Sequence, residues 1–96
     1  MLITMANPMQ SIQTTEIERE VRNFLVMHFL SGRAEKLRDD GSLLGDVIDS
    51  TGVIELVGYL QDRFKITIDD EEVIPANLDT IKNLAAFVAR KLDAEV

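Results

Sequence analysis

The chain contains no cysteine and no tryptophan, and it has one histidine and two prolines among its 96 residues. Without cysteine it can form neither a disulfide framework nor a thiolate site, a composition that fits a reducing cytoplasm. It has no Gly-rich phosphate loop and no Gly-x-Ser-x-Gly elbow, and its histidine, His28, has no paired nucleophile. We therefore expect no catalytic residues, and we expect His28 to lie on the surface or boundary of a helix.

Long hydrophobic runs are also missing. No stretch approaches the length of a membrane span, and residues 1–13 lack the basic start and apolar length of a signal peptide. We expect residues 1–13 to form a flexible tail and residues 14–96 to form one domain, since a chain of this length suits a single domain. The expected location is the cytoplasm, with no membrane association.

Basic residues are scarce where acidic residues are most abundant. The net charge is -7, and residues 39–72 alone contain ten acidic and two basic residues, a net charge of -8. Such a surface repels nucleic acid and favours basic protein partners. The alternative is a solvated acidic face that merely keeps the protein soluble. The pair Asp39–Asp40 lacks further ligands at calcium-loop spacing, so we predict a solvated turn and no metal site.

Helical periodicity predicts an all-α fold. A first helix is expected to start near Thr15, because Thr15 and Glu18 match a capping box. Its apolar face consists of Ile17, Val21, Phe24, Leu25 and His28. Residues 31–48 form a long loop whose apolar side chains predict ordered packing over the helices; they are Leu37, Leu43, Leu44, Val47 and Ile48.

A second helix is predicted from Ser50 to Phe64, with an expected buried face of Val53, Ile54, Val57, Leu60 and Phe64. Glycine in a helix interior costs about 0.5–1 kcal/mol relative to alanine, so Gly58 calls for an explanation. A close contact with another helix is one such explanation.

The rest of the chain predicts two shorter connections and a last helix. Residues 65–68 read as an extended connector with Ile66 or Ile68 in the core, because no second strand exists to pair with them. A short third helix is expected from a cap at Asp69 or Asp70 to about Ile74, ended by Pro75. Asp79 or Thr80 is expected to cap the last helix, whose apolar face is Ile81, Leu84, Ala85, Val88 and Leu92.

Asp49 and Ser50 stand where the second helix should begin, and both are good N-cap residues. Ser50 would there be held by the backbone while facing solvent. One interpretation is that Ser50 only caps the helix. A serine without an adjacent base is a poor nucleophile, but it can accept a group from a separate enzyme that supplies the base and a metal ion.

Asp49–Ser50 followed by Glu55–Leu56–Val57, then Leu60 and Phe64, resembles the acyl carrier protein and peptidyl carrier protein family over about residues 15–92. Residues 66–72 are similar to the family's segment after the second helix. The resemblance implies a four-helix bundle of acyl-carrier type with a long first loop and a short third helix. It also implies a 4'-phosphopantetheine arm, transferred from coenzyme A to Ser50 and flanked by the motif residue Asp49.

The chain departs from the family pattern directly after the serine. Thr51 stands where the family usually has Leu, Met or Ile, and Gly52 stands where many members carry a polar or acidic residue. These departures concern the modifying enzyme and the partners more than the class of protein.

The same resemblance implies a stand-alone, monomeric carrier of acyl or aminoacyl thioesters in fatty-acid, polyketide or related biosynthesis. Implied partners are a phosphopantetheinyl transferase, an acyl- or aminoacyl-loading ligase and downstream synthase enzymes. Asp49, Glu55 and Asp62 are expected to contact partners, since residues seven apart lie nearly on one helix face. Residues 74–78 extend the segment before the last helix and favour a specialised pathway. The alternative function is an unmodified acidic helical domain that binds a basic protein.

Overall fold

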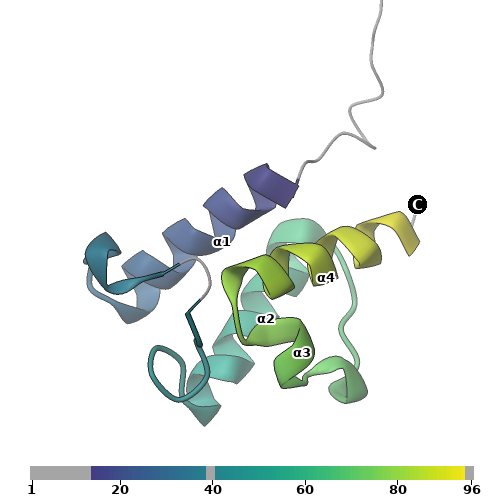
Figure 1. The fold of residues 1–96 in the computed structure, drawn as a ribbon. Helices are drawn as coiled ribbons and strands as arrows, with labels where there is room; N and C mark the ends of the chain where they lie inside the picture. Colours follow the sequence, from purple (N-terminus) through teal and green to yellow (C-terminus); the bar gives the residue numbers. More distant parts are fainter. Residues whose placement is uncertain (1–13, 39–40, 95–96) are drawn as a thin grey trace, which may run out of the picture.

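The described part of the chain is helical. The computed structural model describes residues 14–38 and 41–94, so the predictions for residues 1–13 and for Asp39–Asp40 lie outside it. The elements in chain order are α1 (Thr14–Phe29), η2 (Ala34–Lys36), α2 (Ser50–Phe64), η3 (Asp70–Glu72), α3 (Pro75–Leu78) and α4 (Ile81–Ala94). Figure 1 shows the long helices α1, α2 and α4, with the short α3 beside the start of α4. The predicted all-α architecture, with its long first loop and short third helix, is confirmed.

Helix α1 begins at Thr14, one residue before the expected start, so Thr15 lies inside the first turn and not at the cap. Its buried residues are Ile17, Val21, Leu25 and Val26. Phe24 is partly buried, and His28 is exposed as predicted. Helix α4 covers this face, packing mainly against α1 and α3. No described helix has both the length and the apolar character needed to cross a membrane.

The bounds of α2 are those predicted, and its buried face is predicted correctly at Leu60 and Phe64 but not elsewhere. The face consists of Gly52, Leu56, Leu60 and Phe64, whereas Val53 and Val57 are half-buried. Ile54 is 74% exposed, so the prediction that it lies in the core is wrong. The helix carries apolar residues around more than half of its circumference, and periodicity alone could not determine which of them the other helices cover.

The two glycines of α2 have opposite surroundings. A Cβ at Gly52 would lie 2.8 Å from the Phe29 ring and 2.9 Å from Ile48, so the close packing of α1 against the start of α2 requires glycine there. At Gly58 nothing lies within 4 Å of a Cβ position. The proposed close contact with another helix of the same chain is therefore wrong for Gly58.

In the described parts of the long first loop, residues 31–38 and 41–48, apolar side chains pack onto the helices, as predicted. Leu37, Leu43 and Ile48 are buried, and Leu44 and Val47 are half-buried. The N–H groups of Val47 and Ile48 both donate to the Leu43 carbonyl at 2.9 Å. The loop thus closes a compact turn immediately before Ser50.

After α2 the chain is extended, and both Ile66 and Ile68 are buried. Asp69 is the N-cap residue of η3, which ends at Glu72. Pro75 then starts α3 and does not end a helix, which corrects the prediction. The reason is that proline is well suited to a first helical position, where no N–H is needed and its φ angle is already helical.

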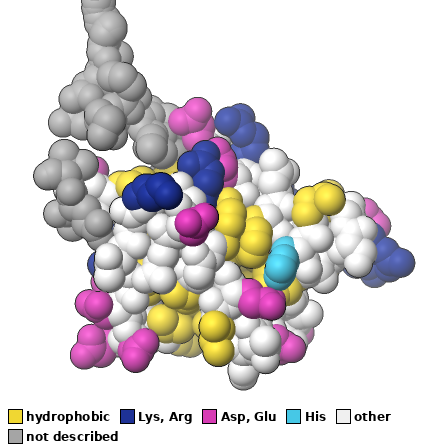
Figure 2. All heavy atoms as spheres, turned by 180° about the vertical axis from the view of Figure 1, so that it is seen from behind, with side chains coloured by type: hydrophobic (Ala, Val, Ile, Leu, Met, Phe, Trp, Pro, Cys, Tyr) yellow, Lys and Arg dark blue, Asp and Glu magenta, His cyan; other side chains and the backbone are white. Residues whose placement is uncertain are grey.

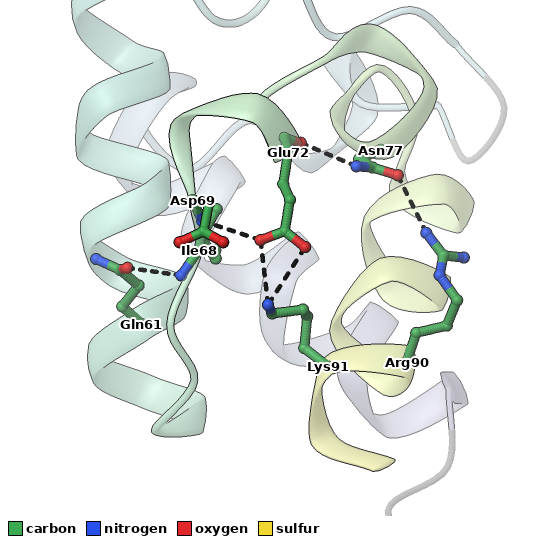
Figure 3. A network of polar contacts seen from close by, with 7 residues as sticks. All are labelled: Gln61, Ile68, Asp69, Glu72, Asn77, Arg90 and Lys91. Atoms are coloured by element: carbon green, nitrogen blue, oxygen red, sulfur yellow. Dashed lines mark hydrogen bonds and ion pairs between the residues drawn. The ribbon is translucent and has the colours of Figure 1, made fainter. Parts of the chain in front are cut away.

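The short elements are fastened to α4 by polar contacts around Glu72, shown in Figure 3. The Glu72 carboxylate accepts hydrogen bonds from the Asp69 N–H at 2.9 Å and from Lys91 Nζ at 3.1 Å. Asn77 Nδ2 donates to the Glu72 carbonyl, and Arg90 donates to Asn77 Oδ1. The bonds from Asp69 and Lys91 lower the pKa of Glu72.

The start of α4 settles which predicted residue caps it. Thr80 Oγ1 accepts a hydrogen bond from the Asn83 N–H at 3.0 Å, so Thr80 is the capping residue. The predicted apolar face of α4 is buried at Ile81, Leu84, Ala85 and Val88, and Leu92 is half-buried. Asp79, the other candidate, is used differently, as described below.

Candidate functional site

Ser50 is the first residue of α2, and it is exposed. The capping role belongs to Asp49, whose Oδ1 accepts a hydrogen bond from the Gly52 N–H at 2.8 Å. The interpretation that Ser50 only caps the helix is therefore wrong. Among the residues that the structure describes, none forms a hydrogen bond with the Ser50 hydroxyl. The hydroxyl is thus free to meet a reactant from solvent.

The surroundings of Ser50 suit a covalently attached phosphate. The hydroxyl stands at the N-terminus of a 15-residue helix, where free N–H groups and the helix dipole favour negative charge. No acidic residue lies in the first turn of α2. An open hollow of about 370 Å³ adjoins Ser50, with Leu44, Ile48 and Val53 among its lining residues. A group attached to Ser50 therefore has room and apolar side chains beside it.

Asp79 holds the loop that leads to Ser50. Its Oδ1 accepts hydrogen bonds from the Ser42 hydroxyl at 2.7 Å and from the Leu44 N–H at 3.0 Å. Its carbonyl accepts a third, from the Leu43 N–H at 2.6 Å. The bonds from Ser42 and Leu44 lower the pKa of Asp79. The sequence showed Asp79 only as a candidate cap, because its actual donors lie 35 or more positions away.

Glu55 and Asp62 are both exposed on α2, as expected, but their surroundings differ. Glu55 Oε1 lies 3.0 Å from Nε2 of His28 on α1. The His28 ring stacks on Phe24 at 4.8 Å, and Phe24 stacks on Tyr59 of α2 at 3.9 Å. Asp62 has no ion-pair partner within the described ranges. The two predicted partner contacts are therefore unequal, because only Glu55 is already engaged by a basic side chain.

A second set of contacts joins α1 to α2 near the end of α2. Arg63 forms an ion pair with Glu20, which raises the pKa of Arg63. The Tyr59 hydroxyl donates to the Glu20 carbonyl at 3.3 Å. Burial raises the pKa of Tyr59, and the Glu20 charge raises it further. These contacts hold the last turns of α2 against α1 at Glu20, in addition to the contact of Glu55 with His28.

The described residues contain no group of three or more His, Cys, Asp or Glu side chains placed to hold a metal ion. Of the residues expected to form the site, Asp49 and Ser50 adjoin at the start of α2. Glu55 and Asp62 lie farther along the same helix.

Comparison with known proteins identifies the class. Residues 33–88 match the family described as "Phosphopantetheine attachment site", which covers more than half of the chain. The chain belongs to this family, whose members act as carriers with 4'-phosphopantetheine as their prosthetic group. It is also similar to the "Probable acyl carrier protein PigG" of Serratia sp. (strain ATCC 39006). The two are 29% identical over 75 residues, which cover 77% of this chain and 86% of that protein. No solved structure matches the chain.

Proposed function

We propose that the protein is a stand-alone acyl carrier whose attachment site is Ser50. The observation that carries this proposal is the exposed Ser50 hydroxyl, free of hydrogen bonds from described residues, at the first position of α2 and within the matched segment. When bound, the prosthetic group supplies the thiol that this cysteine-free chain lacks, on which acyl groups travel as thioesters. The similarity to a protein named as a probable acyl carrier protein supports acyl cargo over aminoacyl cargo.

The attachment step requires an external enzyme. Ser50 Oγ forms a bond to the phosphorus next to the pantetheine in coenzyme A, the bond from that phosphorus to the 3',5'-ADP oxygen breaks, and the hydroxyl proton passes to a base. The neighbouring Asp49 is not assigned as that base, because its carboxylate bonds to the Gly52 N–H and forms no hydrogen bond with the Ser50 hydroxyl in the described chain. A phosphopantetheinyl transferase supplies the base and a metal ion. The chain contributes an accessible hydroxyl and a favourable helix N-terminus.

Partner recognition is proposed to use α2. Asp49, Glu55 and Asp62 are exposed along it, and the apolar side chain of Ile54 is exposed beside them. Figure 2 shows hydrophobic patches bordered by acidic side chains on the face that includes the histidine. An acidic surface of this kind speeds encounters with basic enzymes without requiring a tight complex. The proposed partners are the transferase, an acyl-loading ligase and downstream synthase enzymes.

The segment before α4 forms α3, Pro75–Leu78, the short third helix that the family resemblance implied. It is therefore part of the bundle and not an extension, which removes the sequence feature that favoured a specialised pathway. The proposed pathway class is fatty-acid, polyketide or related biosynthesis.

The decisive experiment is covalent labelling. Incubation with coenzyme A and a broad-specificity phosphopantetheinyl transferase should add one arm, detected by intact mass and mapped to the peptide containing Ser50. Ser50→Ala should abolish the gain, whereas Thr51→Ala, which removes the adjacent exposed hydroxyl, should keep it. An unmodified wild-type chain would favour the alternative, an acidic interaction domain, and an arm on another residue would remove Ser50 from its role.

A further inference from the structure

The segment that leads into Ser50 is a closed turn. The Leu43 carbonyl accepts hydrogen bonds from the N–H groups of Val47 and Ile48, both at 2.9 Å. The Gly45 N–H donates to the Ile48 carbonyl at 2.8 Å. Gly45 has a φ angle of 94°, which glycine adopts without strain, so the chain can reverse there. Leu43 and Ile48 are both buried, and the turn therefore has one side fixed against the core.

Asp79 fixes the start of this turn from the far side of the sequence. Its Oδ1 accepts hydrogen bonds from the Ser42 hydroxyl and the Leu44 N–H, and its carbonyl accepts the Leu43 N–H. Leu43 thus bonds Asp79 through its N–H and closes the turn through its carbonyl. A continuous path of hydrogen bonds runs from the residues before α4 to Ile48, two positions before Ser50.

The same turn forms part of the hollow beside Ser50. Leu44, Gly45 and Ile48 are among the residues that line this hollow. Because the Leu44 N–H is bonded to Asp79, the position of this lining depends on the Asp79 carboxylate. Helix α2 itself is held by other contacts, those of Glu55 and Arg63 with α1. Asp79 therefore acts on the turn and the hollow, while α2 has its own supports.

We infer that Asp79 is a positioning residue for attachment of the phosphopantetheine arm, acting through the turn that ends at Ser50. This inference rests on the proposed function and deepens it. Phosphoryl transfer requires the attacking oxygen, the phosphorus and the leaving oxygen to be roughly in line. A misplacement of about 1 Å can slow such a step about a hundredfold. Loss of the Asp79 bonds should therefore lower kcat, while the KM for the carrier, which reports docking, should change little.

The main test is Asp79→Ala, which removes both side-chain bonds. With coenzyme A and a broad-specificity transferase, this variant should lower kcat about tenfold and leave the KM for the unmodified carrier within about twofold. Asp79→Asn keeps an acceptor oxygen and should recover most of the lost kcat. The matched control is Glu72→Ala, because the Glu72 carboxylate bonds Asp69 and Lys91 instead of the turn. This control should change neither kcat nor KM.

Two further measurements keep the test valid if Asp79→Ala folds poorly. Ser42→Ala removes one of the two bonds and should lower kcat by a smaller factor, with no added effect in the Asp79→Asn background beyond the bond that remains there. Amide hydrogen exchange of the unmodified chain reports the turn directly. The Val47 and Ile48 N–H groups donate to Leu43 and not to Asp79, yet Asp79→Asn should speed their exchange, whereas Glu72→Ala should not.

The outcomes distinguish this inference from the function on which it rests. It is overturned by an unchanged kcat in both Asp79→Ala and Ser42→Ala, or by unchanged exchange of the Val47 and Ile48 N–H groups. An equal loss of kcat in Glu72→Ala would indicate general loosening of the fold and also overturn it. A raised KM with unchanged kcat would do the same, because Asp79 would then act in docking. Failure of the wild-type chain to gain an arm would refute the proposed function, and the positioning role with it.

Discussion

At the scale of single residues, the two acids expected to meet partners are not equivalent. Glu55 lies 3.0 Å from His28, and the histidine ring is held by stacking on Phe24. A basic side chain of a partner must therefore compete with His28 for Glu55. Asp62 is exposed and has no such competitor in the described chain. Its charge is fully available for long-range attraction.

We expect Asp62→Lys to slow association with the transferase more than Glu55→Lys does, and both effects to shrink as salt screens the charges. Stopped-flow association rates across a salt series measure this difference. His28→Gln provides the control, because it frees Glu55 while leaving the charge of Glu55 in place. In the His28→Gln background the two reversals should become more alike. If neither charge reversal, Asp62→Lys or Glu55→Lys, changed the association rate, partners would have to dock away from α2.

The sequence predicted the structural role of some single residues well and of others poorly. Asp49–Ser50 could be located because a short local motif at a helix start determines both the cap and the exposure of the hydroxyl. The burial of Leu56 in place of Ile54 could not be predicted from the sequence. Both side chains are apolar, and only the position of the other helices distinguishes them. The need for glycine at position 52 depends on Phe29, which is distant in the sequence.

At the scale of elements, the carboxylates of Asp79 and Glu72 connect non-helical segments and short helices to the rest of the bundle. Asp79 ties the loop before Ser50 to the start of α4, and Glu72 ties η3 to Lys91 of α4. Neither partnership was predicted, although the bounds of α2 were. Helix bounds follow from local periodicity and caps, whereas these bonds require the folded arrangement of distant segments.

Both carboxylates have a lowered pKa in the folded protein, so the ionised forms favour folding. Their contribution is complete above the pKa of the unfolded chain, near 4, and is lost as the pH falls through the lower folded values. We expect stability to decline on acidification in that range. Asp79→Asn and Glu72→Gln should each flatten the decline, measured by urea denaturation between about pH 6 and pH 3. Glu16→Gln, at an exposed residue of α1, is the control and should leave the slope unchanged. A slope that neither Asp79→Asn nor Glu72→Gln alters would contradict this account.

At the scale of the whole molecule, the charge is unevenly distributed along the chain. Residues 39–72 have a net charge of -8, whereas the segments on either side are close to neutral. In the sequence, this excess surrounds Ser50, the proposed attachment site, and the helix proposed to meet partners. The same charge that is proposed to steer enzymes also repels itself within the fold.

We expect added salt to raise the melting temperature between low and moderate ionic strength, because screening weakens this repulsion. Scanning calorimetry across a salt series measures the effect. Asp62→Lys should make the melting temperature less dependent on salt, while Glu16→Lys, outside the acidic segment, should change that dependence less. If the melting temperature did not change with salt concentration, the acidic groups would be too widely spaced to repel one another.

The stacked pair of Phe24 and Tyr59 gives the protein a built-in optical reporter. Tyr59 is the chain's one tyrosine, and tryptophan is absent, so excitation above the absorption range of the four phenylalanines yields emission from this single ring. The ring lies against α1 and next to Gly58 on α2. A change in its emission therefore signals either separation of α1 from α2 or the arrival of a partner on α2 beside Gly58. Both events can be followed in the unlabelled protein when the partner itself contains no tryptophan.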